Sequence, residues 1–423
     1  MRNKRFILTI IGVSAIIKLV IMAAYFHLWL APGSKDLIGP DGEGFSQRGW
    51  YIAKVLRGEA DYRTPSREFV FEQFNRVVDF YKGELPPFNS RANGLFTYFI
   101  GFVYYLFGYR PFLIKAVNIL INAASSIVLY SLASKIYNKE IAKTAFVVFT
   151  FFPTLFIFSI SALRDPLVIL CILAIIHTLV GHAKNIAPKT ILALFPALTL
   201  LLFLREELFI IMTAAVVFTI IRKQKMKFKI IALLVLPAML LGVTKVPIFY
   251  RIRSRPMVLI KNIAPMAFVK NAGLYHTGGR LAYKTFPDRY YEDYKRYASD
   301  DEYINSPERI TLAGLIKAMP RAVLSYLTRP FPFIHKDPVY TLISFSMIWW
   351  YAVLGLSILG IVRPRHASIY PIVVYTGMIL ILTSIVNANE GILLRHRDMI
   401  APFFILFASA GIDSMRKRTV TDE

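Results

Sequence analysis

Cysteine is nearly absent from this chain of 423 residues, because Cys171, inside an apolar segment, is the only one. A single thiol excludes a disulfide framework and a cysteine-based metal site. Acidic residues are also scarce, at 26 against 50 basic ones, for a formal net charge of +24. In a soluble protein this excess would suggest nucleic acid, but in a membrane protein it is typical of cytoplasmic loops and of surfaces facing anionic lipid. We therefore expect no nucleic-acid partner.

The sequence also lacks a Pro/Ser-rich linker, an internal repeat and a nucleotide-binding loop of the G-x-x-x-x-G-K type. It contains long apolar runs instead. Hydrophobic residues make up 56% of the chain, and several apolar runs have the ~20 residues that a helix needs to cross a bilayer. Because these runs recur throughout, the sequence predicts an all-α polytopic membrane protein in which residues 1–423 form a single integral module.

Basic clusters predict the orientation of the chain. The start M-R-N-K-R and the long apolar run after it predict a retained first transmembrane helix with its basic end inside, in which Lys18 must face the bundle interior or water. Residues 222–229 and 416–418 are the densest later clusters, so both are expected in the cytoplasm. The apolar runs between them make an even number of crossings, as two cytoplasmic ends require: 230–247, 339–362, 368–387 and 399–415.

The number of apolar runs before Lys223 is odd, which would place this residue on the wrong side of the membrane. Run 94–108 is too short for a full crossing, so we expect it not to span. Treating 189–221 as one bent crossing would also repair the parity, and would move Asp165 inside. The first solution predicts about 10–11 transmembrane or re-entrant helices in a cell inner or plasma membrane, with both termini cytoplasmic. It divides the chain into a first outer loop at 31–93, a large second outer loop at 248–338 and C-terminal helices at 339–423.

The segment G-P-D-G-E-G-F, residues 39–45, places Asp41 and Glu43 on a glycine-rich hinge after the first apolar run. Apolar residues then recur at helical spacing, which predicts a helix that lies in the membrane interface and is anchored by Trp50 and Tyr51. The two acids would be held beside the mouth of the helix bundle. If the two acids have only a structural role, they are solvated carboxylates that cap the following helix. Both interpretations stay open from spacing alone.

Further breaks in apolar runs carry charge on the same predicted outer face, at 161–166, 205–207 and 393–398. Asp165 before Pro166 is also a good helix start, and Arg164 could simply snorkel to the surface. However, arginines are unexpected outside the membrane, and a buried anion such as a phosphate would explain guanidinium groups there. The candidate phosphate-binding residues are Arg164, Arg205, Arg329, Arg395, His396 and Arg397.

These residues suit the transfer of a sugar from a polyprenyl phosphate to a hydroxyl group at the outer surface. That reaction needs a carboxylate base at the acceptor and cations where the phosphate departs. Asp41 or Glu43 would be the base, and Asp165 would complete the catalytic acids. Together the three acids could hold a divalent metal such as Mg²⁺ or Mn²⁺. The expected partners are a polyprenyl-phosphate-linked sugar donor, membrane lipids and a glycan, lipid or protein acceptor.

The order of motifs resembles the GT-C superfamily of membrane glycosyltransferases, in particular the branch with protein O-mannosyltransferases and lipid A aminoarabinose transferases. The resemblance rests on G-P-D-G-E-G-F, N-G-L-F-T-Y-F-I-G-F-V-Y-Y-L-F-G, F-F-P-T-L-F-I-F-S-I-S-A-L-R-D-P-L and N-A-N-E-G-I-L-L-R-H-R-D-M-I-A-P-F-F. It implies a GT-C-like bundle, a first-loop acid at Asp41 or Glu43, and a second-loop acid, often linked to a metal, at Asp165. Gly44-Phe45 stands where the family often has Tyr, so the choice between Asp41 and Glu43 stays open.

Three alternatives compete with this interpretation. A polymerase or ligase of lipid-linked oligosaccharides would share the outer arginines and the large outer loop, and can act without a metal. A lipid or polysaccharide transporter or flippase would place ionisable residues and broken helices at mid-membrane, often in two matching halves, which this chain does not show. A non-catalytic assembly partner would keep the fold and tolerate replacement of Asp41 by Asn.

Overall fold

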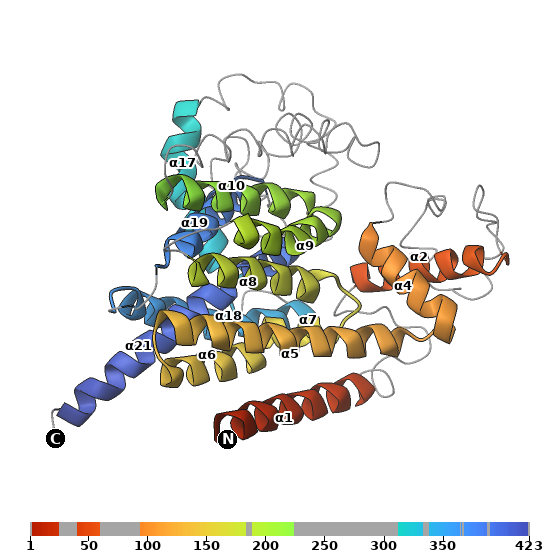
Figure 1. Cartoon of the computed structure of the whole chain (residues 1–423), viewed down its shortest axis with the longest axis horizontal. Helices are drawn as coiled ribbons and strands as arrows, with labels where there is room; N and C mark the ends of the chain where they lie inside the picture. The colour runs from red at the N-terminus through yellow and green to blue at the C-terminus, as the bar shows by residue number, and fades with distance from the viewer. Residues whose placement is uncertain are drawn as a thin grey trace. The chain divides into compact units, whose positions relative to one another are not determined.

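The computed structural model describes residues 2–24, 40–59, 94–182, 188–223, 312–332, 338–363, 365, 368–386 and 390–421. Within these ranges the chain forms fourteen helices and no strand, which confirms the predicted all-α class (Figure 1). The predicted crossing at 230–247 lies outside the described residues, as do 60–93 of the first outer loop and 248–311 of the second.

Several helices have the length and composition of membrane spans. Within the described residues, these are Asn3–Ala24, Pro111–Ile136 and Ser344–Ile361. Helices α6 (Lys139–Phe151) and α7 (Pro153–Ser159), bent by 56° at Pro153, add a fourth if they form one span. Shorter apolar helices cover Leu95–Phe107, Asp165–Gly181, Lys189–Leu204 and Tyr370–Ser384. The protein is thus an integral membrane protein with several apolar helices, and the total of 10–11 stays a prediction.

The chain forms two compact units that are described separately below. Unit 1 comprises 1–134, 138–177 and 193–209, and unit 2 comprises 135–137, 178–192 and 210–423. The helices that contribute to unit 1 are α1 (Arg2–Ala24), α2 (Pro40–Leu56), α4 (Leu95–Phe107), α5 (Pro111–Ile136), α6, α7, α8 (Asp165–Gly181), α9 (Pro188–Leu204) and α10 (Glu206–Lys223). Helices α5, α8, α9 and α10 also contribute to unit 2, which further contains α17 (Leu312–Thr328), α18 (Pro338–Ile361), α19 (Tyr370–Val386), α20 (Glu390–Asp398) and α21 (Ala401–Thr421). The single integral module stays a prediction.

A buried polar stripe runs along α5 in unit 1. Its members recur at helical spacing on one face and are all at most 4% exposed: Lys115, Asn118, Asn122, Ser125 and Ser126. The Nζ atom of Lys18 in α1 donates to Asn122 Oδ1 at 2.6 Å and lies 5.0 Å from the centre of the Phe156 ring. Lys18 is only 2% exposed. The prediction that this lysine faces the interior is therefore confirmed.

Helices α2 and α4 pack against each other in unit 1, at the red-to-orange end of the colour scale (Figure 1). A Cβ atom on Gly49 would lie 2.4 Å from Ile100 Cγ2, so the two backbones approach more closely than larger residues would allow. Trp50 and Tyr51 are consequently buried, and the Trp50 ring lies beside Tyr104. The prediction that these two aromatics anchor α2 in the membrane interface is therefore wrong, because both side chains are buried within the protein.

Helix α4 has 13 residues between Gly94 and Gly108. At a rise of about 1.5 Å per residue it is roughly 20 Å long, well short of a hydrocarbon core of ~30 Å. Its length therefore supports the expectation that this run does not make a full crossing by itself.

Helices α18 and α21 cross closely in unit 2. A Cβ atom on Gly360 would lie 1.7 Å from the Phe407 carbonyl oxygen, and one on Gly411 would lie 2.2 Å from that of Leu356. Beyond the crossing, Arg363 contacts Asp413 and donates to Ser414 Oγ. The two helices therefore need glycine at the crossing, and the ion pair between Arg363 and Asp413 joins them beyond it.

We predict that Gly360→Ala lowers the stability of the protein by about 1–3 kcal/mol or more, because the added methyl group would displace the α21 backbone. Gly355→Ala on the same helix is the matched control, since no atom lies within 4 Å of its Cβ position. That variant should be neutral or gain up to about 1 kcal/mol from helix propensity. Thermal unfolding in detergent measures both, and equal melting temperatures would contradict the close crossing.

Candidate functional site

The turn between α7 and α8 carries the predicted second-loop acid. Its backbone is held by Asn118 of α5, whose Nδ2 donates to the carbonyl oxygens of Ser161 at 2.7 Å and Leu163 at 2.8 Å. Asn118 is 1% exposed. Two bonds from one buried amide fix the path of the turn, so the start of α8 at Asp165 has a defined position.

Asp165 forms a buried ion pair with Arg205. Arg205 Nη2 lies 2.6 Å from Asp165 Oδ1, and the side chains are 6% and 2% exposed. Arg205 also lies 3.7 Å from Glu207 Oε1. Arg205 is the single residue between the end of α9 and the start of α10. The ion pair therefore joins two chain breaks that are 40 residues apart in sequence.

Arg164 belongs to the same site. Its Nη1 donates to the carbonyl oxygen of Leu204 at 2.5 Å, directly before Arg205. Its guanidinium carbon lies 5.7 Å from the centre of the Phe45 ring of α2. The structure thus brings together three of the predicted site residues: Arg164, Asp165 and Arg205.

Helix α2 begins at Pro40, a favourable residue for the first turn of a helix, so Asp41 and Glu43 lie within the helix. The prediction that they stand on a glycine-rich hinge is wrong, because the chain is helical from Pro40 onward. A Cβ atom on Gly42 would lie 3.3 Å from the backbone of Ala162. The first turn of α2 therefore rests on the turn that leads to Asp165. The side chains of Asp41 and Glu43 lie outside the described residues.

The Gly42–Ala162 contact also bears on the two solutions to the topology. Treating 189–221 as one crossing would place Asp165 inside, whereas Gly42 follows the first predicted crossing and is expected outside. Segments in contact must share a face of the membrane. The contact therefore favours the solution in which Asp165 lies on the outer face, although the sidedness itself stays a prediction.

The remaining predicted cations lie in unit 2. Arg397 of α20 is 2% exposed, and its Nη2 donates to the carbonyl oxygens of Tyr326, at 2.5 Å, and Arg329. Its guanidinium group also lies 5.4 Å from the centre of the Trp350 ring. These contacts show that Arg397 holds the end of α17, whereas its role in phosphate binding stays a prediction.

Two side chains of α18 complete this arrangement. Trp350 Nε1 donates to the carbonyl oxygen of Leu327 at 2.7 Å, and the Tyr351 hydroxyl donates to that of Thr328 at 2.5 Å. The last carbonyl groups of α17, which have no partner within the helix, are thereby satisfied. Burial raises the pKa of Tyr326, whereas the Arg397 guanidinium acts in the opposite direction. Tyr326 therefore stays neutral at physiological pH.

Arg329 directly follows α17 in the chain, and Arg395 and His396 precede Arg397 in α20. Arg329 is partly buried and lies 5.9 Å from the centre of the Phe331 ring. Arg395 is partly buried in α20, and His396 is 9% exposed. Their convergence with Asp165 stays a prediction.

The predicted metal site depends on Asp41, Glu43 and Asp165. Within the described part of the chain, no three His, Cys, Asp or Glu side chains form a group that could hold a metal. Asp165 Oδ1 is engaged by Arg205. Carboxylate oxygens suit Mg²⁺ or Mn²⁺ chemically, so the metal site stays a prediction.

The sequence interpretation assigns no role to Asn118 and places Gly42 only on the hinge. Asn118 is recognisable as part of a polar stripe in an apolar helix, because buried amides need partners. Nothing in the sequence identifies Ala162 as the neighbour of Gly42.

The fold and the site define an all-α integral membrane protein that has a buried, charged turn between apolar helices. Residues 94–248 match the family model described as dolichyl-phosphate-mannose-protein mannosyltransferase. This match confirms the predicted resemblance and indicates a membrane glycosyltransferase of the GT-C type. It includes Arg164, Asp165 and Arg205, whereas Asp41, Glu43 and the residues of α20 lie outside it. No curated protein and no solved structure shows significant similarity to the chain.

We predict that Arg205→Met lowers the free energy of unfolding by about 3–5 kcal/mol, because it leaves the Asp165 carboxylate buried without its cation. The double variant Asp165→Asn/Arg205→Met should lose less than the sum of the single variants. Lys143→Met is the control, since Lys143 pairs with Glu140 at the surface at 2.7 Å and should contribute less than about 1 kcal/mol. Denaturant unfolding in micelles measures the cycle, and strict additivity would refute the coupling.

We also predict that Arg397→Gln lowers the stability of the protein by about 2–3 kcal/mol, since it removes charge-assisted bonds to two buried carbonyl groups. Trp350→Phe should cause a smaller loss, of about 1 kcal/mol, because it removes one neutral hydrogen bond. Thermal unfolding without substrate measures both. An Arg397→Gln variant that melts with the wild type and fails only in donor binding would make Arg397 a ligand-binding residue.

Proposed function

We propose that this protein is a glycosyltransferase that moves a sugar from a polyprenyl-phosphate donor to a hydroxyl group on a glycan, lipid or protein at the extracytoplasmic face. The observation that carries the proposal is the contact of Gly42 with Ala162. This contact brings the first turn of α2, with Asp41 and Glu43, to the turn that carries Arg164 and Asp165. The match over 94–248 supports the same reaction class, because the family is described by transfer from a dolichyl phosphate.

In the proposed reaction, Asp41 or Glu43 accepts the proton of the acceptor hydroxyl group. The acceptor oxygen forms the new bond to the anomeric carbon, and the bond from that carbon to the phosphate oxygen breaks. The phosphate leaves with the electron pair, so positive charge beside it stabilises the transition state. Asp165 is less suited to be the base, because it is 1% exposed and already paired with Arg205.

Asp165 and Arg205 instead position the site. Their ion pair fixes the turn against which α2 rests, so loss of the pair would displace the base. Arg164 and Arg205 are the proposed phosphate-binding residues of unit 1, and Arg329, Arg395, His396 and Arg397 are those of unit 2. Asp41, Glu43 and Asp165 would hold a divalent metal, if one is used, and it would neutralise charge on the donor phosphate.

The test is transfer of a labelled sugar from a synthetic polyprenyl phosphate by the purified chain in lipid vesicles. Replacing the base, in Asp41→Asn or Glu43→Gln, should lower kcat by about 10²–10⁴-fold. Glu59→Gln is the control, because Glu59 pairs with Lys54 just beyond the end of α2 and should retain activity. All variants should keep the wild-type melting temperature.

Each alternative function has its own outcome in this assay. Full activity in Asp41→Asn/Glu43→Gln would exclude both acids as the base. Activity only with an oligosaccharide pyrophosphate donor would identify a polymerase or ligase. Movement of labelled lipid across the vesicle without transfer would identify a flippase. A chelator that abolishes transfer, with recovery on Mg²⁺ or Mn²⁺, would support the metal.

A further inference from the structure

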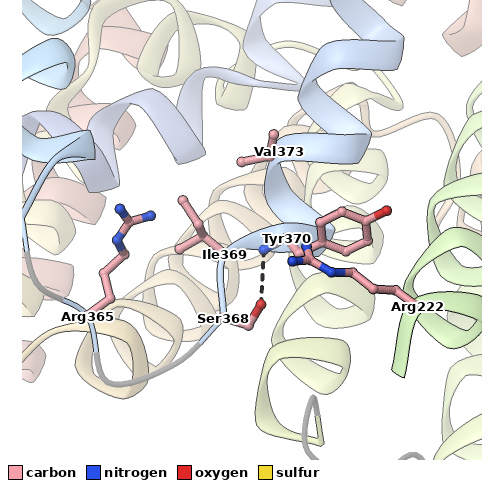
Figure 2. Close-up of a pocket in the computed structure, with 6 residues that line it drawn as sticks. All are labelled: Arg222, Arg365, Ser368, Ile369, Tyr370 and Val373. Carbon is pink, nitrogen blue, oxygen red and sulfur yellow. Dashed lines mark hydrogen bonds between the residues drawn. The ribbon is translucent and has the colours of Figure 1, made fainter. Parts of the chain in front are cut away.

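A pocket of about 360 Å³ opens in unit 2, and none of the residues that line it is an acid of the proposed reaction. Its walls come from the last turn of α10, the segment between α18 and α19, and the first turn of α19 (Figure 2). The lining residues are Arg222, Arg365, Ser368, Ile369, Tyr370 and Val373. Two of the six are arginines and none is acidic, so the pocket favours an anion.

The cationic side chains are held in place. The guanidinium carbon of Arg222 lies 4.3 Å from the centre of the Tyr370 ring, a stacking contact that leaves the N–H edges of the group for a ligand (Figure 2). Arg365 donates from Nε to the carbonyl oxygen of Arg363 at 3.1 Å and from Nη2 to that of Ile361 at 2.6 Å. Both arginines are exposed at their outer edges. The pocket is thus bordered by two oriented positive charges that solvent can reach.

The start of α19 adds polar donors. Ser368 Oγ accepts from the backbone N–H of Tyr370 at 3.3 Å, the bond drawn in Figure 2. This hydroxyl group lies at the N-terminus of a helix of 17 residues, where the unpaired backbone N–H groups carry partial positive charge. Phosphate oxygens are good acceptors for such groups and for guanidinium.

The other wall of the pocket is apolar. Ile369 and Val373 line it, and Val373 is 47% exposed. At the neighbouring end of α18, Val362 is 78% exposed. An inorganic anion would leave this surface unused, whereas a lipid would cover it with its acyl chains. The charge pattern of the sequence predicts this end of the helices in the cytoplasmic leaflet, where anionic lipids are concentrated.

Tyr137 lies at the same end of unit 2. Its hydroxyl group donates to the carbonyl oxygen of Gly360 at 3.1 Å. Burial raises the pKa of Tyr137 to about 12, and the guanidinium groups of Arg365 and Arg363 act in the opposite direction. Arg363 pairs with Asp413, and among the described residues the cations that line the pocket are Arg365 and Arg222.

We propose that this pocket binds the phosphate-bearing headgroup of an anionic membrane lipid, with Arg222 and Arg365 on the phosphate, Ser368 and the start of α19 as further donors, and the acyl chains along Val373. This site shares no residue with the proposed reaction. Its occupancy would hold together the ends of α10, α18 and α19, the elements that line it.

The experiment uses the full chain, purified in detergent, with phosphatidylglycerol, phosphatidylcholine or inorganic phosphate as the probe. Native mass spectrometry measures retained lipid, and thermal unfolding measures stabilisation. We expect phosphatidylglycerol to bind and stabilise more strongly than the other two. Arg222→Gln and Arg365→Gln should each weaken its binding by roughly tenfold, the effect of losing one charge-assisted contact. Tyr370→Leu, which removes the stacking surface, should weaken it less.

Lys189→Gln is the matched control, because Lys189 is an exposed cation of unit 2 outside the pocket and on the same predicted face. Its phosphatidylglycerol binding should equal that of the wild type. Equal losses in Lys189→Gln and Arg222→Gln would show general attraction by charge and would overturn the proposal. Equal stabilisation by inorganic phosphate and phosphatidylglycerol would overturn the lipid as the occupant. If Arg365→Gln does not fold, the phosphatidylglycerol binding of Arg222→Gln and Tyr370→Leu tests the proposal without it.

Discussion

The site of unit 1 depends on one interaction, the buried ion pair between Asp165 and Arg205. Each charge would be costly alone among apolar helices, so each holds the other in place. Because Asp165 begins α8 and Arg205 stands between α9 and α10, the pair fixes two chain breaks at once. Asn118 then holds the turn before Asp165, and Gly42 allows α2 to rest on that turn. The position of the proposed base therefore depends on these contacts, because they hold the turn on which α2 rests.

The sequence predicts the charged positions of the site well and their partners poorly. Asp165 and Arg205 interrupt apolar runs, and charge in such a place is visible without a structure. Their pairing is not visible, because it joins positions 40 residues apart. Asn118 shows the same limit, since its amide is apparent in α5 whereas its acceptors, 43 and 45 residues away, depend on how α7 and α8 pack.

The errors in the interpretation of α2 have a common physical cause. Glycine permits bending and also permits close packing, and the sequence does not distinguish the two. Gly42 is predicted to serve a hinge, but a Cβ atom at Gly42 would meet the backbone of Ala162, and one at Gly49 would meet the side chain of Ile100. Once α4 lies that close, Trp50 has to be buried with Tyr104. An amphipathic pattern therefore predicts the helix correctly and leaves open whether lipid or protein covers its apolar face.

The excess of basic residues has a structural use that composition alone does not reveal. With 50 basic and 26 acidic residues, many arginines need partners other than carboxylates. Four of them donate to carbonyl groups at the C-terminal ends of helices, where a positive charge also complements the helix dipole: Arg57 at α4, Arg164 at α9, Arg397 at α17 and Arg365 at α18. A guanidinium group has five N–H donors, so such a bond leaves others for a phosphate. Position on the predicted outer face is therefore weak evidence of phosphate binding by itself, because a buried arginine there can serve the end of a helix instead.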